Sequence, residues 1–272
     1  MTISASFLSG CALAALTAFP APALAGDYDP VTADVLQGWT LPDGRRMAAI
    51  RLTLEPGWKT YWRAPGDAGI PPQFDWSRTR NIEGVDISWP TPTVYSENGM
   101  RSLGYSGQVV LPLHVTPKRQ GEPMRLRTTM SLGVCADVCL PHELHIDAML
   151  DVADPSPTPA IVAALADMPY AASEAGVVRA ACHIAPSERG MSIEAHVTLP
   201  YTGGTEVAVI EPGTPGIWVS EARTARQGDT VVAISEMIHP DGGAFGIDRS
   251  DVRITILGGA YAVDVQGCTA AG

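Results

Sequence analysis

Long apolar runs are missing from most of this 272-residue chain. Beyond residue 25, no segment approaches the ~20 consecutive apolar residues that a membrane-spanning helix needs. We therefore expect the mature chain to be soluble. Internal repeats and heptad patterns are missing as well, which argues against repeat and coiled-coil architectures.

Charged residues are missing from the first 25 positions. There an apolar run from Phe7 to Phe19 leads to the small-residue sequence Ala23-Leu24-Ala25, which predicts a secretory signal peptide over residues 1–25. Cys11 follows Leu8-Ser9-Gly10, as in a lipoprotein cleavage box, and lipidation at Cys11 is the less favoured alternative. Export would place the mature chain in an oxidising compartment, where disulfides persist.

Basic residues are outnumbered, with 18 Lys and Arg against 29 Asp and Glu and a formal net charge of −11. An acidic chain is repelled by phosphate backbones and by anionic lipid headgroups. The charge therefore argues against nucleic acid and anionic membrane surfaces as partners.

Cysteine is also scarce, with five residues, of which Cys11 falls in the predicted leader. The other four allow three pairings, and their spacing favours Cys135–Cys139 and Cys182–Cys268. By loop entropy the long Cys182–Cys268 bridge would stabilise the fold by roughly 4–5 kcal/mol and the short one by only about 2. We therefore expect the long disulfide to be structural, whereas stability is a poor reason for the short one.

A proline-rich segment divides the chain after residue 25 into two parts. Residues 153–159 hold three prolines in seven positions and are typical of a linker, and a short helical run over 160–168 follows. We therefore expect a first domain at 26–152, a linker with a short helix at 153–170 and a second domain at 171–272. Short strands at regular spacing, separated by Gly-rich turns, predict an all-β protein whose second domain is a smaller β-sandwich.

The short cysteine pair lies between two alternating segments, residues 125–132 and 144–150. Alternating segments joined by a Gly- and Pro-bounded stretch predict a β-hairpin, whose register is fixed by its apolar face. Cys135 and Cys139 would then be held close together at its tip.

Three interpretations of this pair remain open from the residues alone. In a redox pair, one cysteine must be exposed and partly ionised so that its thiolate can attack a disulfide. Asp137 between the cysteines would raise a thiol pKa and a protonated His142 would lower one, and no Lys or Arg occurs in residues 131–146. The local charges therefore predict a moderate nucleophile, and Cys139, the nearer to His142, is favoured as the residue attacked first.

The second interpretation is a copper-binding module that uses Cys135, Cys139 and His142 as soft ligands. The wider spacing, with His145 as a fourth candidate, matches no standard zinc signature, and alternation places His142 and His145 on opposite strand faces. The third interpretation is an inert structural disulfide of the kind that exported β domains carry. We assign no metal and no cofactor.

Several motifs resemble the amino-terminal periplasmic domain of the thiol:disulfide interchange protein DsbD and of the related ScsB-type reductases (suppressor of copper sensitivity). They appear in the family's order and cover about residues 27–152: PGWKTYWRAPGDAG at 56–69, Asp75-Trp76, Trp89-Pro90, GYSG at 104–107 and GVCADVCLP at 133–141.

The resemblance implies an immunoglobulin-like sandwich for the first domain, with Cys135 and Cys139 as the redox pair. It implies a location in the periplasm of a Gram-negative bacterium and the function of a protein-disulfide reductase. Its electrons would come from a membrane thiol transporter of the DsbD or CcdA type, or from a thioredoxin-like partner, and would pass to disulfides of periplasmic clients. Copper tolerance and cytochrome c biogenesis are processes in which such proteins act.

In DsbD a short loop caps the cysteines, and the corresponding segment here is 93–100, with Tyr95 and Glu97 as the cap candidates. DsbD-type proteins continue into membrane helices and a thioredoxin-like domain, whereas this sequence ends at Gly272. We therefore expect a separate protein to supply the electrons. Trp58, Tyr61 and Trp62 are interpreted as core and sheet-edge packing.

Overall fold

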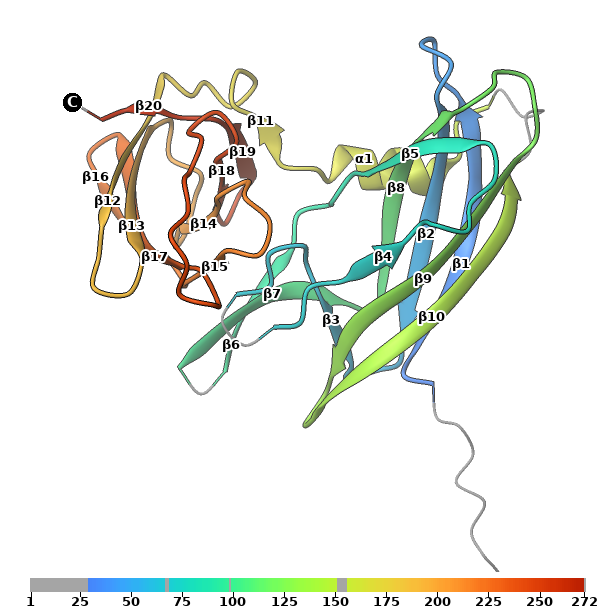
Figure 1. Cartoon of the computed structure of the whole chain (residues 1–272), viewed down its shortest axis with the longest axis horizontal. Coiled ribbons are helices and arrows are strands. Elements are labelled where there is room, and N and C mark those ends of the chain that lie inside the picture. The colour runs from blue at the N-terminus through green and yellow to red at the C-terminus, as the bar shows by residue number, and fades with distance from the viewer. Residues whose placement is uncertain (1–28, 67–68, 98, 151–155, 272) are drawn as a thin grey trace, which may run out of the picture.

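The computed structural model describes residues 29–66, 69–97, 99–150 and 156–271. These residues form two groups of β-strands with the short helix α1 (Pro159–Ala166) between them (Figure 1). The predicted signal peptide, Cys11 and the first part of the predicted linker lie outside the described residues. Among the described residues, no helix has the length and apolar character needed to cross a membrane.

The first domain is a sandwich of two antiparallel sheets, which confirms the predicted all-β fold. One sheet has the order β1-β2-β8-β5, and the other has the order β10-β9-β3-β7-β6, with β4 also paired to β9. The strands are β1 (Val31–Thr40), β2 (Arg46–Leu54), β3 (Lys59–Tyr61), β4 (Gln73–Asp75), β5 (Ile82–Ile87), β6 (Thr93–Glu97), β7 (Met100–Ser106), β8 (Gln108–Pro117), β9 (Met124–Cys135) and β10 (Cys139–Leu150).

Strand alternation builds the core of this sandwich. On β9, Leu126, Met130 and Leu132 are buried, and they share one face because successive side chains point to opposite sides. Ile50 on β2 and Leu111 on β8 are buried in the same apolar cluster. One face of each sheet is thus covered by the other.

The second domain is a smaller sandwich. Its sheets have the orders β11-β19-β18-β14 and β15-β17-β13-β12-β20, with β16 paired to β17. The strands are β11 (Tyr170–Ala171), β12 (Arg179–Pro186), β13 (Met191–Thr198), β14 (Val207–Glu211), β15 (Trp218–Val219), β16 (Arg223–Gln227), β17 (Thr230–Ile238), β18 (Arg253–Leu257), β19 (Ala262–Gln266) and β20 (Thr269–Ala270).

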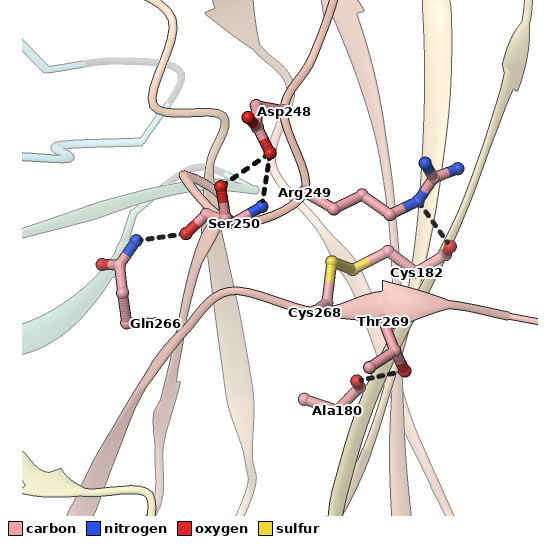
Figure 2. The surroundings of a disulfide bond; sticks show 8 residues. All are labelled: Ala180, Cys182, Asp248, Arg249, Ser250, Gln266, Cys268 and Thr269. Carbon is pink, nitrogen blue, oxygen red and sulfur yellow. Dashed lines mark hydrogen bonds between the residues drawn. A yellow bond between two sulfur atoms is a disulfide. The ribbon is translucent and has the colours of Figure 1, made fainter.

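A disulfide between Cys182 and Cys268 joins the first long strand of this domain to its last segment (Figure 2). Cys182 is 1% exposed and lies on β12, to which β20 is paired in parallel. The Arg249 side chain donates to the carbonyl of Cys182 over 3.4 Å, and the Thr269 hydroxyl donates to the carbonyl of Ala180 over 3.1 Å. The surrounding hydrogen bonds hold both ends of this bridge against one sheet.

Helix α1 begins at Pro159, where a missing amide hydrogen costs nothing. Its Ile161 is buried against Met47 and Ala49 of β2, on the face that is turned away from the sandwich core. The helix therefore covers the outside of the first domain and does not act as a free linker.

Candidate functional site

The β9–β10 hairpin places Cys135 and Cys139 opposite each other at its tip. The pairing runs without a break from Met124 and Leu150 to the two cysteines (Figure 1). The sulfurs are joined in a disulfide with Cα atoms 4.1 Å apart, closing a turn in which the Ala136 amide donates to the Val138 carbonyl over 3.1 Å. A register set along the whole hairpin thus fixes the position of the pair.

Charges on the hairpin stem reinforce this register. Asp147 on β10 accepts hydrogen bonds from the guanidinium groups of Arg125 and Arg127 on β9. The hydrogen bonds from Arg125 and then Arg127 lower the pKa of Asp147 to about 2. The carboxylate therefore stays ionised, and the cross-strand contacts persist, well below neutral pH.

The two cysteines differ in exposure. Cys135 is 1% exposed, whereas Cys139 is exposed and lies beside Val138 and Leu140, which are 62% and 44% exposed. An incoming thiolate can therefore approach the disulfide from the side of Cys139.

Tyr61 contacts both sulfurs and is a site residue that sequence reasoning missed. Its hydroxyl oxygen lies 2.8 Å from Sγ of Cys135 and 3.3 Å from Sγ of Cys139. The expectation of core packing was right about burial, since Tyr61 is 4% exposed. It gave no role to the hydroxyl, which sits where negative charge would develop if the disulfide opened.

Two glycines make room for the Tyr61 ring. A Cβ atom on Gly133 would lie 3.0 Å from one edge of the ring, and one on Gly69 would lie 2.8 Å from the other. Gly133 precedes the cysteines on β9, and Gly69 comes from the segment after β3. Both glycines belong to the motifs that carry the family resemblance, so these motifs provide the space that the Tyr61 ring occupies.

A cation also reaches this region from another strand. Lys59 on β3 is the register partner of Cys135, and its ammonium lies 5.0 Å from the ring centroid of Tyr95. Lys59, Tyr95 and Cys135 line a cavity of about 430 Å³, together with Trp58 and Ser106. Lys59 lies far outside residues 131–146 in the sequence, and only the β3–β9 pairing brings it to the cysteines.

The segment of the cap candidates forms a β-hairpin, β6–β7, and not the loop that the resemblance suggests. Tyr95 lies on β6, at the edge of the cysteine sheet, and shares the 430 Å³ cavity with Cys135. Glu97 is the last residue of β6. The structure thus places Tyr95 at a cavity that Cys135 also lines.

His142 does not share the side of the strand that carries Cys139. The two residues are three positions apart on a regular strand, so their side chains alternate, and His142 Nε2 lies 3.6 Å from Asp29 Oδ1. Asp137 is exposed in the turn. In the part of the chain that the structure describes, no three His, Cys, Asp or Glu side chains are grouped as metal ligands. The sequence proximity of His142 to Cys139 is therefore not proximity of their side chains.

The first domain is thus an immunoglobulin-like sandwich that carries a disulfide at the tip of a hairpin. Residues 30–151 match the family model "Thiol:disulfide interchange protein DsbD, N-terminal", so this part of the chain is similar to that family. The match confirms the resemblance stated from the motifs.

The structure is also similar to the N-terminal periplasmic domain of ScsB from Proteus mirabilis. The TM-score is 0.67 at 19% sequence identity, and the match covers 91% of this chain and 96% of that chain. The shared fold therefore includes the second domain. No curated protein matches the sequence.

Proposed function

We propose that the protein is a periplasmic protein-disulfide reductase in which Cys135 and Cys139 are the redox pair. The observation that carries this proposal is the unequal burial of a disulfide in contact with the Tyr61 hydroxyl. An exposed sulfur suits attack by a partner, and a buried sulfur with a hydrogen-bond donor suits the leaving thiolate.

In the reductive step, a donor thiolate attacks Sγ of Cys139 and the Cys135–Cys139 bond breaks. Cys135 leaves as a thiolate, to which the Tyr61 hydroxyl donates a hydrogen bond. The donor's second thiolate then attacks the donor sulfur of the mixed disulfide, and Cys139 leaves as a thiolate. The donor leaves oxidised, and the dithiol of this protein is left with both electrons.

In the delivery step, the Cys139 thiolate attacks a disulfide in a client and forms a second mixed disulfide. Cys135 then attacks Cys139 Sγ, re-forms the original disulfide and releases the reduced client. The donors we propose are a membrane thiol transporter of the DsbD or CcdA type, or a thioredoxin-like protein. The clients are periplasmic proteins with disulfides, including those of copper tolerance and cytochrome c biogenesis.

Trapping of mixed disulfides tests these roles. Cys135→Ser leaves Cys139 without a resolving thiol, so a disulfide-bearing client peptide should remain attached in a form that a reductant releases. The matched variant Cys139→Ser leaves only the buried thiol of Cys135 and should trap little. Equal trapping by both variants would contradict the assigned order of attack.

The order in which the two disulfides open tests the redox role itself. The Cys135–Cys139 disulfide should open in a mild thiol reductant while Cys182–Cys268 stays closed. If the buried Cys182–Cys268 bridge opened first, the short disulfide would be an inert staple and the proposal would fail.

We also propose that Tyr95 caps the pair, because it borders the cavity that Cys135 lines. Tyr95→Ala should then raise the rate at which the disulfide reacts with small thiols. An unchanged rate would show that Tyr95 does not cap the cysteine pair.

A further inference from the structure

The segment after Tyr61 connects the redox site to the second domain. Trp62 is fully buried, and its amide donates to the Leu103 carbonyl over 2.9 Å, so the backbone next to Tyr61 is fixed. The next residue, Arg63, reaches across to the second domain. Its Nε lies 3.1 Å from both carboxylate oxygens of Glu211, and its Nη2 donates to the Thr255 hydroxyl over 3.2 Å.

This contact is sheltered from water. The Arg63 side chain is 12% exposed, that of Glu211 is 25% exposed, and Thr255 is fully buried. The Arg63 guanidinium also stacks on Trp62, with its carbon 3.9 Å from the ring centroid. A bidentate pair that is partly removed from water holds its geometry better than an exposed pair.

A second ion pair joins the same two parts of the structure. Arg101 on β7 is paired with Glu221 of the second domain, and both side chains are about one-quarter exposed. β7 is the direct neighbour of β3, with Gly104 opposite Tyr61. The second domain therefore contacts β7 and the segment that directly follows β3.

A cavity of about 450 Å³ lies at this junction, and one of its lining residues, Gly69, lies next to the Tyr61 ring. Gly69 and Pro65 line it from the first domain, and Glu211 and Trp218 line it from the second. Gly69 is also the residue whose close approach leaves the Tyr61 ring no space on that side. Gly69 thus borders both the cavity at the domain junction and the Tyr61 ring.

We propose that Arg63 and Glu211 are positioning residues for the redox pair, through which the second domain holds the Tyr61 hydroxyl against the sulfurs. The second domain then assists the chemistry without touching the cysteines. This inference rests on the proposed reductase function, because it assigns the second domain a part in opening the Cys135–Cys139 disulfide.

The test is Glu211→Gln in the full chain, with the rate of reduction of Cys135–Cys139 by dithiothreitol followed by alkylation and mass measurement. The expected result is a reduction rate about fivefold lower, the lower end of typical coupling between sites. The pH at which the reduced pair forms its thiolate should rise in parallel, which a purely structural contact would not cause.

Asp34→Asn is the matched control. Asp34 accepts two hydrogen bonds from Arg51, at 2.8 and 2.7 Å, between β1 and β2 of the other sheet. The Asp34→Asn variant loses the same kind of bidentate ion pair, but at a place without contact with Tyr61. Its rate of disulfide reduction, and the pH at which its reduced pair forms the thiolate, should therefore equal those of the unaltered protein.

The pathway through Tyr61 is tested in a Tyr61→Phe background. Without the hydroxyl, adding Glu211→Gln should change the rate no further, since coupled residues are not additive. Arg63→Gln should reproduce Glu211→Gln, and the double variant Arg63→Gln/Glu211→Gln should be no slower than either single one.

Each result separates the inference from the function on which it rests. If the disulfide of the unaltered protein resists reduction, the reductase proposal fails. If it is reduced readily and Glu211→Gln reacts at the same rate or faster, only the positioning role fails. A slower rate in Asp34→Asn, or an additive loss in the Tyr61→Phe background, would also overturn the inference.

Discussion

Replacing Tyr61 by phenylalanine removes one oxygen atom from the site and leaves the ring in its seat between Gly69 and Gly133. That oxygen lies 2.8 Å from Sγ of Cys135, within hydrogen-bond range for sulfur. When the disulfide is reduced, the Tyr61 hydroxyl can donate to the Cys135 thiolate. Tyr61→Phe therefore destabilises the reduced, ionised state far more than the disulfide, because a neutral disulfide sulfur is a weak acceptor.

The size of the effect follows from the strength of one charge-assisted hydrogen bond. Such bonds contribute about 1.5–3 kcal/mol. At 1.36 kcal/mol per pKa unit, the pKa of the Cys135 thiol should rise by about 1–2 units in Tyr61→Phe. At 30 mV per 1.4 kcal/mol for a two-electron couple, the reduction potential should fall by about 30–60 mV where the thiolate is formed.

Equilibration with glutathione buffers of known potential measures this shift, with the Cys135–Cys139 dithiol quantified by alkylation. The thiolate pKa is measured separately, by ultraviolet absorbance of the reduced protein during a pH titration. The thermal transition should hardly move, because the ring and its packing remain. An unchanged potential and an unchanged thiolate pKa would show that the hydroxyl has no part in the redox step.

Three further predictions concern the scaffold. Replacing Cys182 and Cys268 together by serine should lower the free energy of unfolding by about 2–5 kcal/mol, measured by urea denaturation, and should leave reduction at the hairpin tip unchanged. The folded-state pKa of Asp147 is depressed, so its ion pairs contribute stability that is present above pH ~4 and lost as the pH falls toward about 2. Asp147→Asn should remove this part of the stability, and thermal melts across this range should show a flatter acid dependence. Gly133→Ala places a methyl group 3.0 Å from the Tyr61 ring, so it should cost about 1–3 kcal/mol in overpacking. By displacing the Tyr61 hydroxyl from the sulfurs, it should also slow the reduction of the Cys135–Cys139 disulfide.

The hairpin could be predicted from the sequence because alternation and turn residues are local signals. The expected strands ended at Leu132 and began again at Leu144, whereas β9 and β10 continue to the cysteines. Gly133 and Pro141 interrupt the apolar pattern in that stretch, but cross-strand pairing carries the ladder through both of them. Pairing between strands depends on both segments, so the pattern of one segment alone does not show how far the pairing extends.

The site beyond the cysteines could not be predicted in the same way. Tyr61 and Lys59 lie on a three-residue strand, too short for a periodic signal, and the sheet brings them beside the cysteines through the β3–β9 pairing. His142 shows the opposite case, since its nearness in sequence is cancelled by strand alternation. Charges near the cysteines along the chain were therefore a poor guide to charges near them in space.

The two disulfides differ in what the fold loses when they open. Cys182 and Cys268 are 86 positions apart, so their bridge restricts the unfolded chain strongly and its loss is expensive. Cys135 and Cys139 are four positions apart and already face each other at the end of an unbroken hairpin, so their bridge adds little restriction. Reduction at the tip leaves the register, the Tyr61 seat and the stem contacts of Asp147 to hold the two thiols together. A pair whose proximity is enforced by the sheet and not by the bond itself can open and close repeatedly, which is the property that disulfide exchange requires.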